Sequence, residues 1–205
     1  MKKVVLFLVV SLFSGLLCAE ESIQLPEPDK KGSMPLAQAL AGRKTIRKYS
    51  ARDLSRRQLS DLLWAANGVS RPDGKRTAPT AANRQELELY VLTAKGAWHY
   101  QPMTHQLKKI TSEDLRAWAG RFKAPVYLVI AADMKKAASD HYASMDTGYV
   151  SQNIYLHCAA NGMGTCAIGS FARIKDSGNG KKLHDGLKLS DNMKIELTHS
   201  VGMLN

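Results

Sequence analysis

The seven residues from Arg43 to Tyr49 (RKTIRKY), called here the cationic segment, carry four cations, one hydroxyl and one aromatic ring. Arginine and lysine offer charge-assisted hydrogen-bond donors that suit a phosphate, and the threonine adds a hydroxyl donor. The charge alone is equally typical of a solvated basic turn, since runs of like charge are often exposed. The segment therefore predicts an anion site only if other parts of the chain complete it.

Two further stretches have the small residues and turns of a ligand loop. The small-residue loop, Pro79 to Asn83 (PTAAN), ends a long connection that begins at Val69, and the segment Gly164 to Ser170 (GTCAIGS) contains two glycines. Small residues let backbone N–H groups come close to a flat or phosphorylated ligand. Each stretch alone is typical of a surface turn. Together with the cationic segment they predict a site that holds a phosphate at one end and a ring at the other.

Common catalytic and metal-binding motifs are missing from the sequence. It has no Gly-x-Ser-x-Gly, P-loop, His-Glu-x-x-His or strand-linked Gly-x-Gly-x-x-Gly motif, and its six histidines are scattered. Cys158 and Cys166 lack zinc-type spacing and are either a disulfide or two separate thiols. We expect Cys158 to pack inside and its neighbour His157 to face solvent. The sequence gives no support to a hydrolase or a metal site.

Hydrophobic periodicity predicts the elements that must position these stretches. Helices are predicted over residues 34–42, 55–68, 112–119, 141–161 and 181–187, with Ser55 and Thr111 as N-caps. Strands are predicted over 87–93, 97–100, 106–110 (at an edge), 125–131 (fully buried), part of 164–170, and 194–201. This mixed order predicts an α+β fold in which a sheet is flanked by helices.

Composition and charge describe one globular domain. The 205 residues are 44% hydrophobic and 23% charged, which is enough for a buried core. The formal net charge of +11 favours phosphates, acidic ligands or a membrane surface as partners. Nucleic acid is not expected, because the cations are spread along the chain and no DNA-binding motif is present.

The N-terminus has the pattern of an export signal. Lys2 and Lys3 precede an apolar run from Val4 to Leu17, and Ala19 suits the last position before cleavage. An uncleaved membrane anchor is the alternative. The predicted division is a signal peptide over 1–19, an extended leader over 20–33 and a single domain over 34–205. We therefore expect a periplasmic or secreted protein, which contacts a membrane only if the signal stays attached.

Four blocks, in order along the chain, resemble the FMN-dependent nitroreductases over about residues 36–202. They are residues 43–49, 76–83 with 87–91, 146–153, and 162–169. The first block looks like the family's opening Arg-Arg-Ser-x-Arg-x-Phe/Tyr motif. The second is similar to a subgroup of flavin dehydrogenases that oxidise azoline rings in modified peptides.

The resemblance implies an α+β fold with a mixed or antiparallel sheet, an intertwined homodimer, and FMN in each interface site. The cationic segment would hold the phosphate, ribityl chain and pyrimidine edge, and the small-residue loop would reach the flavin from the partner subunit. The third stretch would lie under the ring, with a backbone N–H near flavin N5. The implied FMN-binding residues are Arg43, Lys44, Thr45, Arg47, Thr80, Ala81, Asn83, Ala167, Ile168 and Gly169.

By the same resemblance, the activity is an oxidoreductase that passes two electrons through flavin N5 to a small quinone- or nitroaromatic-like acceptor. NAD(P)H is a possible donor, although an exported protein does not meet the cytosolic pool. Arg84 to Glu86 replaces a Pro-containing segment of the family, and Val201 to Asn205 lacks the basic residues that many relatives place on the phosphate. These departures leave open a non-catalytic flavin- or nucleotide-binding protein, and the cations alone leave open an envelope-binding domain.

Overall fold

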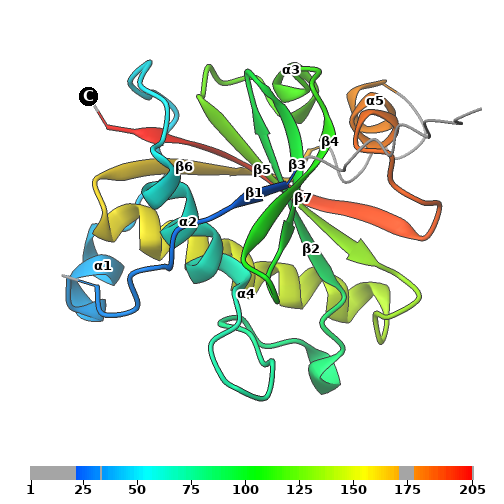
Figure 1. Cartoon of the computed structure of the whole chain (residues 1–205), viewed down its shortest axis with the longest axis horizontal. Coiled ribbons are helices and arrows are strands. Elements are labelled where there is room, and N and C mark those ends of the chain that lie inside the picture. The colour runs from blue at the N-terminus through cyan, green and yellow to red at the C-terminus, as the bar shows by residue number, and fades with distance from the viewer. Residues whose placement is uncertain (1–21, 33, 171–177, 205) are drawn as a thin grey trace, which may run out of the picture.

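The computed structural model describes residues 22–32, 34–170 and 178–204. Its helices are α1 (Leu36–Gly42), α2 (Arg56–Asn67), the 3-10 helix η1 (Ala81–Asn83), α3 (Arg116–Ala119), α4 (Asp140–Ala160) and α5 (Gly178–Gly186). Its strands are β1 (Ser22–Gln24), β2 (Leu87–Thr93), β3 (Gly96–Gln101), β4 (Gln106–Thr111), β5 (Val126–Asp133), β6 (Met163–Ile168) and β7 (Met193–Met203). Figure 1 shows the helices on both sides of one sheet, which confirms the α+β class.

Within the described residues the sheet has seven strands, in the order β1-β4-β3-β2-β5-β7-β6. Neighbouring strands are antiparallel throughout. Strand β5 lies near the middle, and all of its residues except Asp133 are buried. A strand covered on both faces needs apolar side chains in both directions, which explains the continuous run Val126 to Ala132 and confirms its predicted burial.

Two cores lie on opposite faces of the sheet. Helices α2 and α4 cover one face, where Leu63 and Ile154 pack with Ile130. Helices α3 and α5 cover the other face, where Leu183 packs with Val129. The alternation of side chains along β5 sends successive residues to the two cores, so each helix pair buries its own apolar stripe.

Helix α2 begins where the sequence predicts it to begin. The Ser55 hydroxyl accepts a hydrogen bond from the Gln58 N–H, and the Gln58 side chain accepts one from the Ser55 N–H. This capping box satisfies two of the donors that a helix N-terminus leaves free. The Ser55 prediction is confirmed, and the cap fixes the point at which the chain turns into α2.

The expected leader contributes a strand that sequence periodicity did not reveal. Strand β1 pairs with β4, so the expected edge position of residues 106–110 is wrong. Leu25 is 3% exposed, and its N–H donates to the His105 carbonyl at 3.2 Å. The Ser60 hydroxyl donates to the Pro26 carbonyl at 2.5 Å. Pairing and burial therefore tie this part of the chain to the domain.

The predicted helix over 112–119 is shorter than expected, and its predicted cap is wrong. Helix α3 follows Leu115, which makes no side-chain cap. The Thr111 hydroxyl accepts from the Glu113 N–H, and Asp114 binds the Arg116 guanidinium at 2.7 Å. Because these side chains bond to neighbours two residues away, they stabilise turns in place of a first helical turn. The other helix and strand limits differ from prediction by three residues or fewer.

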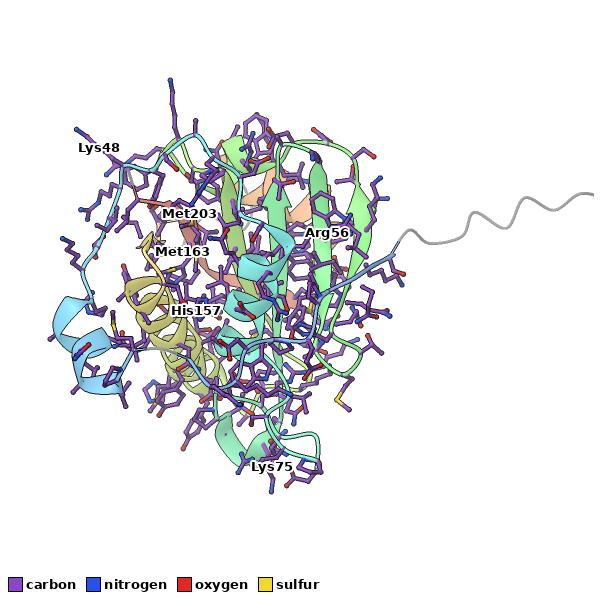
Figure 2. The ribbon with its side chains drawn as sticks, turned by 60° about the vertical axis from the view of Figure 1, so that its left-hand side comes forward. Lys48, Arg56, Lys75, His157, Met163 and Met203 are labelled. Carbon is purple, nitrogen blue, oxygen red and sulfur yellow. The ribbon has the colours of Figure 1, made fainter. Side chains whose placement is uncertain are left out.

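The two neighbouring residues near the end of α4 differ in burial. Cys158 is 1% exposed, as expected, and both Cys158 and Cys166 are free thiols. His157 is half-buried, on the side of α4 that faces α2 (Figure 2), so its predicted solvent position is wrong. Burial lowers the pKa of His157 to about 4. In the described ranges no helix is long and apolar enough to span a bilayer.

Replacing Leu25 by alanine is expected to lower the free energy of unfolding by about 2–5 kcal/mol, because it removes a buried side chain from the core. The control is Met103→Ala, which removes a comparable volume from a side chain that is 70% exposed. Urea denaturation measures both. Equal stability of the two variants would show that residues 22–32 do not contribute to the core as described.

Candidate functional site

The cationic segment runs against the last two strands of the sheet. The Ile46 N–H donates to the Thr165 carbonyl at 2.9 Å, and the Ser50 N–H donates to the Met203 carbonyl at 2.9 Å. The Tyr49 hydroxyl lies 2.7 Å from the Ser200 Oγ. These bonds fix the backbone of the segment from Ile46 to its end, so Arg47 and Lys48 project from a defined position.

Two glycines permit this close contact. A Cβ at Gly164 would lie 2.6 Å from the Ile46 side chain, and a Cβ at Gly202 would lie 2.7 Å from the Tyr49 Cβ. Both separations are shorter than side-chain carbons tolerate, so a larger residue would push the segment away from the sheet. Gly164 therefore has a packing role in addition to the loop role that its sequence suggests.

Tyr155 of α4 joins the cationic segment to β6. Its hydroxyl accepts from the Ala167 N–H at 3.0 Å and shares a hydrogen bond with the Thr45 hydroxyl at 3.2 Å. The Arg43 guanidinium lies 5.2 Å from the Tyr155 ring centroid, within the range of a cation–π contact. Sequence reasoning missed Tyr155, because nothing in the pattern of α4 shows what its hydroxyl binds.

A buried histidine supports Tyr155 from below. His199 is fully buried and is hydrogen-bonded to the Ser151 and Thr165 hydroxyls, at 2.9 Å each. Its ring meets the Tyr155 ring edge-on at 5.4 Å. Burial lowers the pKa of His199 to about 3, so the ring is neutral at physiological pH. The neutral ring fills the space beneath Tyr155 and is held there by its two hydrogen bonds.

A cavity of about 380 Å³ brings the first and third predicted stretches together. It is lined by Arg47, Arg121, Phe122, Cys166, Ala167, Ile168, Gly169 and Ser170. Arg121 and Phe122 carry no signal in the sequence, since they follow α3 in a connecting segment. The Phe122 backbone is held by the Tyr127 hydroxyl, which accepts from its N–H at 3.0 Å and donates to its carbonyl at 2.6 Å.

The charge of this site is not neutralised within the described ranges of the chain. Arg43, Lys44 and Arg47 make no ion pair with any carboxylate there. Lys44, Thr45 and Arg47 are exposed, and Arg43 is half-buried against Tyr155. A cluster of unpaired cations beside a concave surface attracts an anion with little competition from the protein's own carboxylates.

The small-residue loop lies elsewhere on α4. The Ala81 N–H donates to the Asp146 carboxylate at 2.8 Å, and the Thr80 hydroxyl accepts from the Gln85 N–H. Asp146 precedes Tyr155 by about 13 Å along the helix axis. The structure therefore does not bring Thr80, Ala81 and Asn83 to the Arg47 cavity within one chain.

The loop is held in an uncommon conformation. Ala82, Asn83 and Gln85 have φ values of 51°, 53° and 50°, which non-glycine residues adopt at a cost. Beneath them, burial and the neighbouring Asp146 raise the pKa of Glu86, which is 1% exposed. In this strained turn Asn83 is exposed, where a second molecule can contact it.

Comparison with known proteins identifies the family of the chain. The nitroreductase family model matches residues 40–203. Three proteins described as putative nitroreductases are similar. One from Methanocaldococcus jannaschii is 32% identical over 169 residues, covering 73% of this chain and 84% of that protein. The structure from Ralstonia eutropha has a TM-score of 0.82 at 31% identity, covering 91% of each chain. The structure from Desulfovibrio desulfuricans, solved with FMN, has a TM-score of 0.62 at 20% identity, covering 84% and 87%. The chain belongs to the nitroreductase family.

Proposed function

We propose that the protein is an FMN-dependent oxidoreductase of the nitroreductase type. The observation that carries this proposal is the Tyr155 hydroxyl, which joins the cationic segment to the strand that lines the cavity. One site thereby contains unpaired cations that can bind a phosphate and small residues against which a flat ring can pack. The FMN bound by the Desulfovibrio relative on the same fold supports the choice of cofactor.

The residues present fit FMN. Arg43 and Lys44 supply the charge-assisted donors that a phosphate requires, and Thr45 adds a hydroxyl for the phosphate or ribityl chain. Arg47 lines the cavity and would bind the pyrimidine edge. Gly169 also lines it, and its missing side chain lets a flat ring come close to the backbone.

Bound FMN would supply two-electron transfer through N5, from a reductant to a small electrophilic acceptor such as a quinone or nitroaromatic compound. The chain's own residues would bind the cofactor and orient it. Pairing of Ile168 with Thr198 holds the end of β6, and with it the Gly169 N–H that we assign to N5. A donor fixed at this position would favour the reduced cofactor and help to orient N5 for hydride transfer. The protein needs no nucleophile of its own.

A homodimer would complete the site. Exposed apolar side chains gather on two helices that contact each other: Leu36 and Leu40 on α1, and Tyr142, Met145 and Tyr149 on α4. The three α4 residues fall on one helical face, with exposures of 43–47%. We propose that a second copy covers this surface and brings its small-residue loop to the flavin.

Export is also proposed, on the sequence pattern of residues 1–19, which lie outside the described residues. A periplasmic or secreted protein would take electrons from a reductant in that compartment, with NAD(P)H as the donor only where it is available. Cleavage of the signal peptide would give a mature chain that begins after Ala19. This proposal is independent of the cofactor assignment.

Replacing both Arg43 and Arg47 by alanine is expected to weaken FMN binding by about a hundredfold or more. Each guanidinium contributes a charge-assisted bond of about 1.5–3 kcal/mol. Quenching of FMN fluorescence measures the affinity. Lys48→Ala is the control, because Lys48 lies in the same segment but at the periphery in Figure 2. Wild-type affinity in the double variant would contradict the assignment.

Tyr155→Phe is expected to weaken FMN binding by about tenfold, because the cationic segment and β6 lose their shared hydroxyl. The same fluorescence titration measures this effect, and thermal unfolding of the apoprotein shows whether the fold is intact. Tyr90→Phe removes a hydroxyl that makes no hydrogen bond in the described part of the chain, lies outside both the cavity and the proposed interface, and serves as control. If the two variants bind FMN equally well, Tyr155 does not organise the site.

Met145→Glu is expected to convert the dimer to a monomer, because it places a charge in the proposed apolar interface. Light scattering after size-exclusion chromatography measures the mass, and the absorbance of the same peak measures bound flavin, which should fall with dissociation. Met103→Glu introduces the same charge at another exposed methionine and should change neither. A wild-type monomer that retains FMN would refute the interface.

A further inference from the structure

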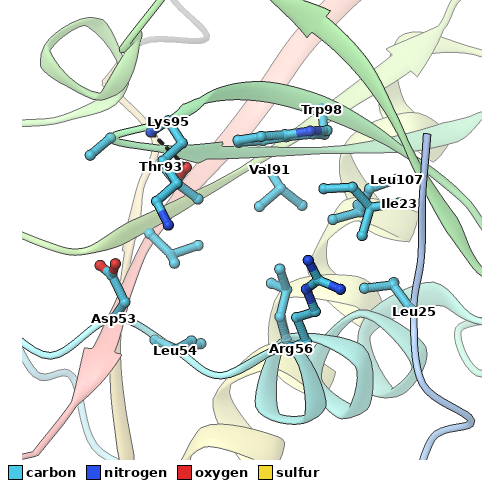
Figure 3. A pocket seen from close by; sticks show the side chains of 13 residues that line it. Ile23, Leu25, Asp53, Leu54, Arg56, Val91, Thr93, Lys95, Trp98 and Leu107 are labelled. Atoms are coloured by element: carbon cyan, nitrogen blue, oxygen red, sulfur yellow. Dashed lines mark hydrogen bonds between the residues drawn. The ribbon is translucent and has the colours of Figure 1, made fainter. Parts of the chain in front are cut away.

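A second cavity lies between the start of α2 and the face of β1, β3 and β4, and shares no residue with the Arg47 cavity (Figure 3). Its volume is about 190 Å³. Most of its lining is apolar: Ile23, Leu25, Leu54, Leu59, Val91, Trp98, Leu107 and Val126. An apolar cavity of about 150 Å³ in another protein binds benzene, so this one has room for a small apolar body.

Arg56, an exposed arginine, lines the cavity and points into it. Arg56 makes no ion pair or side-chain hydrogen bond in the described part of the chain, and Figure 3 shows its guanidinium directed toward the space below Trp98. Arg56 is the first residue of α2, so the positive end of the helix dipole lies at the same rim. Lys95 and Asp53 both line the end of the cavity that is away from Arg56.

We infer that this cavity binds a small amphipathic monocarboxylate. The apolar body of the ligand packs against Ile23, Val91 and the Trp98 ring, where burial of its surface supplies the affinity. Its carboxylate binds the Arg56 guanidinium, whose planar fork matches a carboxylate in geometry. A neutral apolar molecule would leave Arg56 without an anionic partner.

The inference does not depend on the proposed flavin chemistry, because no residue of the Arg47 cavity takes part. Isothermal titration of the full-length protein, as purified, with hexanoate tests it, and hexan-1-ol is the neutral probe. Hexanoate is expected to bind one per chain and more tightly than the alcohol. The flavin absorbance, followed in parallel, is expected to stay unchanged.

Two variants locate the ligand. Arg56→Gln is expected to weaken hexanoate binding by about tenfold and to leave hexan-1-ol unaffected, whereas Arg52→Gln, an exposed arginine outside the cavity, changes neither. Ile23→Phe narrows the cavity and is expected to weaken binding of both probes. Absence of hexanoate binding to the wild type, or binding that is insensitive to both Arg56→Gln and Ile23→Phe, overturns the inference. Binding that perturbs the flavin spectrum instead assigns the ligand to the cofactor site and overturns it as well.

Discussion

The close contact between the cationic segment and strands β6 and β7 is the constraint on which the rest of the site depends. It exists because Gly164 and Gly202 leave space for Ile46 and Tyr49, and because backbone groups bond across it. Without this contact the cations would belong to a free loop. With it, Arg47 faces the same cavity as the end of β6, and a charged group and a ring can be bound together.

The electrostatics of the site follow from where charge is left unpaired. Arg43 and Arg47 have no carboxylate partner in the described residues, while His199 beneath them is buried and neutral. A neutral hydrogen-bonded ring supports Tyr155 without adding charge below a bound anion. The protein therefore concentrates positive potential at the surface of the site and keeps its interior uncharged, which suits a cofactor with one anionic end.

Local pattern was enough to predict much of the fold. The buried strand predicted over 125–131 and the Ser55 cap could be read directly, because burial on two faces and helix capping leave clear signals in the sequence. Strand β1 could not, since three residues hold no periodicity and their pairing with β4 is a tertiary event. The short α3 shows the same limit: a threonine before a helical pattern can cap a helix or a turn.

The residues of the site likewise include some that the sequence indicates and others that only the fold brings together. Residue type and order indicated the cationic segment and the strand from Ala167 to Gly169, and the structure places both at one cavity. Tyr155, Arg121 and Phe122 were missed, because their roles come from the fold and from no motif. Thr80, Ala81 and Asn83 are predicted to reach the site from a partner subunit, and within one chain their loop contacts α4 at Asp146, about 13 Å along the helix from Tyr155.

The most direct test is the visible spectrum of the wild-type protein after incubation with excess FMN and removal of free flavin. We predict a yellow protein that holds one FMN per chain and is bleached by a reductant and reoxidised by a quinone under anaerobic conditions. A colourless protein after this treatment would contradict the cofactor site. A yellow protein whose flavin passes no electrons to a quinone or a nitroaromatic compound would contradict the proposed activity.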